Sequence, residues 1–145
     1  MIKKPIIKFV GYILLFLGLS MFATSLWPLY YNENDFFIFI KSGLITSITA
    51  LILLFFSRGT TKSEINLRDG FYVVTMAWVS MGIFSSIPYY QSTFFSSFTD
   101  AFFESMSGIT TTGATVLGNI EALPHGLLFW RSFTQFIGGM GIILF

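Results

Sequence analysis

Ser107-Gly-Ile-Thr-Thr-Thr-Gly-Ala-Thr-Val-Leu117 is a polar, β-branched stretch around Gly113, within a chain that is otherwise apolar. Hydrocarbon offers no hydrogen bonds to a backbone, so non-helical chain at membrane depth occurs only where it is buried in protein or lines a watery path. A Thr- and Gly-rich loop between apolar segments therefore indicates carbonyl oxygens that replace the water shell of a cation. Taken alone, the stretch also fits a simple polar turn between two spans.

The composition is typical of an integral membrane protein. Hydrophobic residues make up 54% of the 145-residue chain and charged residues 10%, whereas soluble domains carry about 25% charged residues. One histidine and no cysteine exclude a disulfide framework and leave little for a zinc site or a Cys–His nucleophile. We therefore expect no enzyme and no resident cofactor, and the net charge of +1 gives no indication of a nucleic-acid partner.

Four apolar segments predict an all-α integral membrane protein. They extend over about 6–29, 36–56, 70–90 and from 127 to the last residue, and a span needs about 20 residues. The prediction is an N-terminal transmembrane hairpin over 1–58, a cytoplasmic linker over 59–69 and one helix–pore loop–helix repeat over 70–145. We expect the last helix, 125–145, to be truncated where the chain stops.

Basic residues predict the orientation of these spans. Cytoplasmic loops carry an excess of Lys and Arg. The basic residues before the first span, or between the second and third, are Lys3, Lys4, Lys8, Arg58, Lys62 and Arg68. The N-terminus is therefore expected in the cytoplasm and segment 91–126 outside, in a multi-pass protein of the cytoplasmic (inner) membrane that contacts lipid.

Segment 91–126 is too apolar for a surface loop and predicts a re-entrant unit. Its phenylalanines recur at helical spacing, which indicates a half-helix over 99–108. Ser97, Thr99 or Asp100 can cap its start, and Gly108 can end it. Such a helix of about two turns is too short to span, so the chain is expected to continue as a filter loop over 109–117 and return to the same side by Pro124.

The C-terminal end of the half-helix carries the negative pole of its macrodipole, which favours a cation beside it. The loop that follows would expose carbonyl oxygens, which suit a hard alkali cation and bind it weakly enough to release it. Gly113 permits a positive φ or a close approach to an axis, and threonine side chains can hydrogen bond behind the loop. The candidate ion-binding residues are Thr111, Thr112, Gly113 and Ala114, with Thr110 and Thr115 as support.

Two charged residues lie at predicted membrane depth. Ionisable groups there are costly and usually paired, so we expect Glu104 on the half-helix to contact Arg131 on the last helix, with Asp100 as the alternative partner. The pair would clamp the half-helix in place; the alternative is that Glu104 attracts ions into a vestibule.

Two adjoining blocks resemble the Trk/Ktr/HKT potassium transporters. Phe102-Phe-Glu-Ser-Met-Ser-Gly-Ile-Thr-Thr-Thr-Gly-Ala-Thr-Val-Leu117 resembles the first pore loop of that family. Leu123-Pro-His-Gly-Leu-Leu-Phe-Trp-Arg-Ser-Phe-Thr-Gln-Phe-Ile-Gly-Gly-Met-Gly-Ile-Ile143 is similar to the helix that follows it in TrkH-type members. The resemblance implies that Thr111, Thr112 and Gly113 occupy filter positions, where backbone carbonyls such as those of Thr111 and Thr112 bind potassium. Family members repeat the helix–pore loop–helix unit four times, and this chain contains one.

The resemblance also implies a function: potassium uptake by the ion-conducting subunit of a Trk-type system, with K⁺ as the transported ion and no cofactor. It implies a homodimer at full length, bound by a cytoplasmic nucleotide-binding regulatory subunit. Two alternatives stay open, namely a sodium-conducting or sodium-coupled relative and a non-conducting membrane assembly or regulatory subunit.

Overall fold

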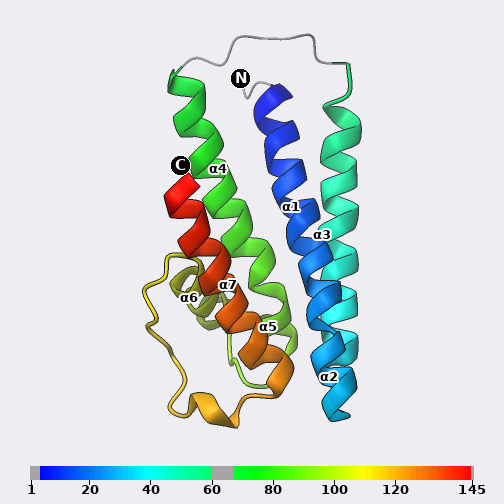
Figure 1. Cartoon of the computed structure of the whole chain (residues 1–145), viewed down its shortest axis with the longest axis vertical. Coiled ribbons are helices and arrows are strands. Elements are labelled where there is room, and N and C mark those ends of the chain that lie inside the picture. Colours follow the sequence, from blue (N-terminus) through cyan, green and yellow to red (C-terminus); the bar gives the residue numbers. More distant parts are fainter. Residues whose placement is uncertain (1–3, 60–66, 145) are drawn as a thin grey trace.

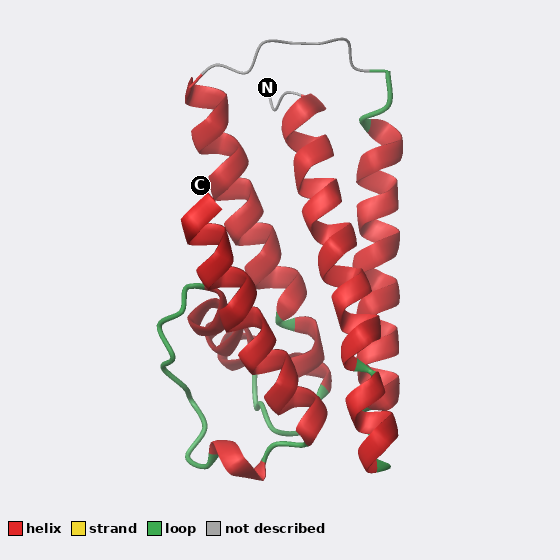
Figure 2. Ribbon diagram, viewed as in Figure 1, coloured by secondary structure: helices red, strands yellow, loops and turns green. Residues whose placement is uncertain are grey.

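The computed structural model describes residues 4–59 and 67–144, and within those ranges every regular element is a helix. Figure 1 shows long helices side by side, with a short helix and a long loop beneath the last one. Figure 2 shows the loops gathered mainly at one end of the molecule. Three helices of the described chain are long and apolar enough to cross a membrane. The predicted all-α membrane architecture is confirmed.

The N-terminal hairpin pairs α1 (Lys4–Thr24) and its continuation α2 (Leu26–Tyr31) with α3 (Phe36–Phe56). Asn32 ends α2 in the left-handed conformation with φ of 55°, which asparagine tolerates. The helices approach closely through small residues, because a Cβ built on Gly18 would lie 2.3 Å from Oγ of Ser47. Close contact through small residues is how helices pack in lipid. Gly18 of α1 and Ser47 of α3 are the small residues that meet at this contact.

The third apolar segment forms two helices, α4 (Leu67–Ser85) and α5 (Ile87–Gln91). The first helix begins three residues before the expected residue 70, and the helical segment is interrupted at Ser86. Pro88 lies in the first turn of α5, where its missing N–H costs least. The indole Nε1 of Trp130 donates a hydrogen bond of 3.0 Å to the carbonyl of Ser85 at the interruption. Trp130 is fully buried, so it is a packing residue of the interior.

The segment predicted to be re-entrant, here called the re-entrant unit, consists of α6 (Phe98–Ile109), the 3-10 helix η1 (Ile120–Ala122) and α7 (His125–Leu144). The chain enters α6 and returns through η1 at the end of the molecule where α2 lies (Figure 1). Ser97 is the cap, since its side chain accepts a hydrogen bond from the N–H of Asp100. The helix has 12 residues, about three turns, so the expected bounds of 99–108 and two turns were too short at both ends.

Parts of the predicted organisation fall outside the described residues. These are linker residues 60–66, the predicted basic residues Lys3 and Lys62, the side chain of Arg68, and Phe145. Helix α7 is not among the three candidate spans found in the described chain. A fourth span therefore stays a prediction.

Candidate ion-binding loop

The first residues of the loop, directly after α6, hydrogen bond back to the last turn of that helix. The amide N–H groups of Thr110, Thr111 and Thr112 donate to the carbonyls of Met106, Gly108 and Ser107, at 2.8, 3.0 and 3.0 Å. These bonds satisfy carbonyls that a helix end leaves free. They also direct the following residues away from the helix axis.

Two residues of the loop have left-handed backbone. Gly113 has a φ of 77° and Thr111 a φ of 57°. Glycine adopts this conformation freely, as expected for Gly113, whereas a β-branched residue rarely does. No feature of the sequence indicates the left-handed conformation of Thr111.

The carbonyl oxygens of the loop are in different situations. That of Ala114 accepts a 2.6 Å hydrogen bond from the Ser107 hydroxyl, and that of Gly113 accepts one of 3.2 Å from Nη2 of Arg131. Within the described chain, no hydrogen bond reaches the carbonyls of Thr111 or Thr112. All four residues are exposed, so the loop offers carbonyl oxygens to a hard cation at the surface of this unit.

The threonine side chains turn back toward the protein. The Thr110 hydroxyl donates to the Met106 carbonyl at 2.7 Å and lies 2.8 Å from the Thr112 hydroxyl. Thr115 donates to Oε2 of Glu104 at 2.8 Å. These contacts engage the hydroxyls of Thr110, Thr112 and Thr115 within the protein.

Glu104 joins the half-helix, the loop and α7. Its buried carboxylate accepts hydrogen bonds from Nε of Arg131 at 2.8 Å, from Thr115 and from the N–H of Val116 at 3.3 Å. Arg131 continues the chain of contacts to the Gly113 carbonyl. The structure thus contains the expected Glu104–Arg131 pair, while Asp100, the alternative partner, makes no ion pair with Arg131 among the described residues.

Several residues of the site were not anticipated. Ser107 holds the Ala114 carbonyl, and the hydroxyls of Ser85 and Ser105 bond to each other in the interior. Oγ of Ser105 also donates to the Gly82 carbonyl at 2.8 Å. No sequence pattern distinguishes these serines from the other serines of the chain, because their hydrogen bonds depend on which segments pack together in the fold.

A second polar contact ties the hairpin to α7. Oε1 of Glu33 accepts a hydrogen bond of 3.2 Å from the N–H of His125 and lies 2.7 Å from its Nδ1. Burial alone would raise the pKa of Glu33, but the hydrogen bonds and charge of His125 outweigh it, so the pKa lies below its usual value.

The described residues contain no group of three or more His, Cys, Asp or Glu side chains that could hold a metal ion. The arrangement instead combines apolar spans, a capped re-entrant helix and an exposed carbonyl loop. Together with the helical architecture, these features define an all-α integral membrane protein.

Comparisons with known proteins identify the family. A family model described as "TrkH: Cation transport protein" matches residues 36–145. The chain belongs to this family of transport proteins, which is not a family of enzymes.

Curated relatives agree with the family match. The chain is 38% identical to an uncharacterized cation transporter of Methanocaldococcus jannaschii, over 97% of this chain and 29% of that protein. It is 38% identical to the Trk system potassium uptake protein TrkH of Vibrio parahaemolyticus, with the same coverage. It is also 38% identical to TrkG of Escherichia coli, over 92% of this chain and 28% of that protein.

A solved structure shows the same fold. The crystal structure of the potassium transporter TrkH from Vibrio parahaemolyticus matches with a TM-score of 0.90 and 37% identity, over 99% of this chain and 31% of that one. The chain thus spans about three tenths of the length of its relatives.

Proposed function

We propose that this chain is the N-terminal part of a potassium uptake protein and supplies one pore loop of its selectivity filter. The observation that carries the proposal is the exposed loop Thr111–Ala114, whose carbonyls follow the C-terminal end of α6. Potassium is favoured over other cations because relatives in two bacteria are named potassium uptake proteins. The three further loops of a complete filter rest on the family resemblance.

The ion pair explains how an arginine can lie beside a cation site. Nη2 of Arg131 is 3.2 Å from the Gly113 carbonyl, and an isolated positive charge there would repel a cation. Glu104 neutralises that charge at 2.8 Å. Arg131 then fixes the direction of the Gly113 carbonyl by a hydrogen bond, and a carbonyl oxygen has a second lone pair for the ion. Glu104 and Arg131 are therefore positioning residues rather than ligands.

The membrane orientation of the protein and its partners are inferred from the charge pattern and from the family resemblance. The N-terminus is placed in the cytoplasm of a multi-pass inner-membrane protein because basic residues cluster at that end of the spans. The homodimer and the cytoplasmic nucleotide-binding regulatory subunit rest on the family resemblance alone. Ion movement is channel-like, through the carbonyls of the four loops, and is driven by the membrane potential and ion gradient.

The test compares two glycines of the loop region in the full-length protein. Gly113 and Gly118 both have open space where a Cβ would be, but only Gly113 has a positive φ. Gly113→Ser is expected to weaken discrimination between potassium and sodium by tilting neighbouring carbonyls, whereas Gly118→Ser is the matched control and should behave as wild type.

Thr112→Ser should keep most of the selectivity, because the hydroxyl that contacts Thr110 survives.

The measurement is rubidium uptake at limiting potassium, with sodium as competitor, in cells that lack other uptake systems. Wild-type uptake and ion preference in Gly113→Ser would remove this loop from the filter. A wild-type preference for sodium would instead favour a sodium-conducting relative, and a well-expressed protein without uptake would favour a non-conducting subunit.

A further inference from the structure

Two cations share a hollow at the end of the hairpin where α1 begins and α3 ends. Lys8 and Arg58 both line a hollow of about 500 Å³, together with Tyr12, Leu51, Leu54, Phe55 and Gly59. Both cations are exposed, and no acidic residue of the described chain lines the hollow. Among the described residues, the lining therefore combines two positive charges with apolar walls.

Arg58 follows the C-terminal end of α3, and Lys8 lies in the second turn of α1. The Arg58 guanidinium carbon lies 5.5 Å from the centre of the Phe55 ring, a cation–π distance that directs the side chain along the wall. Lys8 lies near the start of α1, which carries the positive pole of that helix. The C-terminal end of α3 lies at the same hollow and carries the opposite pole, so the positive potential comes from the two side chains.

We propose that this hollow binds the headgroup phosphate of an anionic phospholipid. Two cations require an anion, and the apolar walls formed by Leu51, Leu54 and Phe55 suit acyl carbons rather than a hydrated free phosphate. α1 with α2, and α3, are two of the candidate membrane spans, so the hollow lies where these helices reach the membrane surface. Basic pockets between transmembrane helices have the chemistry that recognises acidic lipid headgroups.

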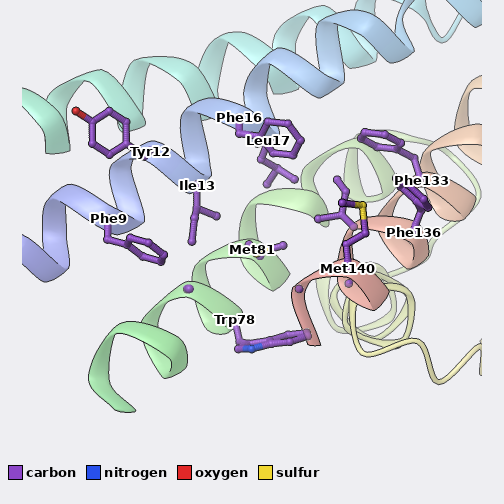
Figure 3. Close-up of a pocket in the computed structure, with 14 residues that line it drawn as sticks. Phe9, Tyr12, Ile13, Phe16, Leu17, Trp78, Met81, Phe133, Phe136 and Met140 are labelled. Carbon is purple, nitrogen blue, oxygen red and sulfur yellow. The ribbon is translucent and has the colours of Figure 1, made fainter. Parts of the chain in front are cut away.

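The acyl chain of such a lipid has an apolar path from this site. Tyr12 lines the headgroup hollow and also a second groove of about 520 Å³ between α1, α4 and α7. Figure 3 shows that groove surrounded by large apolar side chains, among them Phe9, Ile13, Trp78 and Met81. An acyl chain that passes Tyr12 can enter it, and the exposed tyrosine hydroxyl can donate to the phosphate.

The test measures lipid retention by native mass spectrometry of the full-length protein purified with phosphatidylglycerol and phosphatidylcholine. Lys8→Gln and Arg58→Gln are each expected to lower the apparent affinity for phosphatidylglycerol about fivefold, and more together, since each cation near a membrane surface contributes on this scale. Phosphatidylcholine retention should not change. Lys8→Arg with Arg58→Lys keeps both charges and should retain the lipid as wild type does.

Lys41→Gln is the matched control, because Lys41 is an exposed lysine in the first half of α3, away from the hollow. It should retain phosphatidylglycerol as wild type does. Unchanged affinity in the doubly neutral variant would overturn the proposal, as would equal losses in the charge-retaining variant. Displacement of phosphatidylglycerol by inorganic phosphate would also overturn it, because the site would then take a free anion.

Discussion

Thr111 has the same left-handed backbone as Gly113, but at a much higher energetic cost. A non-glycine residue in this region costs roughly 1–3 kcal/mol and persists only where the surroundings hold it. The N–H of Thr111 donates to the Gly108 carbonyl at 3.0 Å, and its methyl group faces Gly139 of α7. Strain held at one carbonyl of an exposed loop is consistent with pre-organisation for binding.

Glu104 and Arg131 form a buried ion pair, and its contribution to stability can be measured by substitution. Removing one partner of Glu104 and Arg131 leaves an uncompensated charge, which costs roughly 3–5 kcal/mol. Glu104→Gln and Arg131→Gln should each lower the midpoint of thermal unfolding and the yield of folded protein. The double variant should lose less than the sum of the two single losses, because no charge is then left unpaired.

Asp100→Asn is the control for this cycle, since Asp100 lies on the same helix and makes no ion pair with Arg131 among the described residues. It should unfold close to wild type. Additive losses of Glu104→Gln and Arg131→Gln would show that the contact contributes no coupling energy.

Among the helices, α6 can pack closely against α7 because α7 has a glycine, Gly138, where the two helices meet. A Cβ built on Gly138 would lie 1.8 Å from the carbonyl oxygen of Ile109, the last residue of α6. On the facing helix, a Cβ on Gly108 would lie 2.7 Å from Oγ1 of Thr134. Gly138 is therefore a packing residue between α7 and the end of α6. The end of α6, and with it the start of the loop, is set by this contact.

Gly138→Ala should therefore disturb the loop as well as the packing. A backbone carbonyl gives way less easily than a flexible side chain, so we expect a loss of about 1–3 kcal/mol from overpacking, together with reduced rubidium uptake. Gly141→Ala is the comparison, because nothing lies within 4 Å of its added Cβ and alanine favours helix. Equal stability and uptake in the two variants would contradict the close contact.

At the scale of the whole molecule, the hairpin and the re-entrant unit are joined at one end. Trp27 stacks on Phe129 with ring centres 3.8 Å apart, and Tyr31 stacks on His125 at 3.9 Å. A Cβ on Gly126 would lie 2.6 Å from the ring of Pro28. Together with the Glu33–His125 contact, these make the hairpin a support for the start of α7.

The Glu33 contact predicts a pH dependence. Because its pKa is lowered in the fold, the ionised form stabilises the native state above the ordinary value of 4.5, and that stability is lost as the pH falls through the lowered pKa. Burial and the charge of Glu33 raise the pKa of Asp35, so its protonation has the opposite effect. The comparison is therefore made in an Asp35→Asn background.

In that background, Glu33→Gln should remove about 1 kcal/mol of stability near neutral pH and should remove less once the pH falls below the lowered pKa of Glu33, which lies under 4.5. Thermal unfolding of the purified protein at both pH values measures this difference. Glu121→Gln serves as the control, since Glu121 is exposed and its substitution should show no such dependence. A Glu33→Gln effect that stays equal at both pH values would contradict the assignment.

Much of this fold was predictable from the sequence because it depends on local patterns. The apolar segments predicted helices, since lipid leaves a backbone few other ways to satisfy its hydrogen bonds. The helical spacing of the phenylalanines predicted a half-helix capped by Ser97, Thr99 or Asp100, and the glycine in Thr-Thr-Thr-Gly indicated either a positive φ or a close approach at Gly113. The Glu104–Arg131 contact was also predictable, because charges at membrane depth need partners.

Other features were decided only by tertiary contacts. The interruption at Ser86, the positive φ of Thr111 and the hydrogen bond from Ser107 to Ala114 all depend on segments that meet across the fold. The same holds for Glu33 and His125, which are 92 residues apart. The sequence determines the hydrophobic periodicity of each helix and shows which polar or charged residues need a hydrogen-bonding or ionic partner. Which residue becomes that partner depends on how the helices pack. No local sequence pattern encodes that packing geometry.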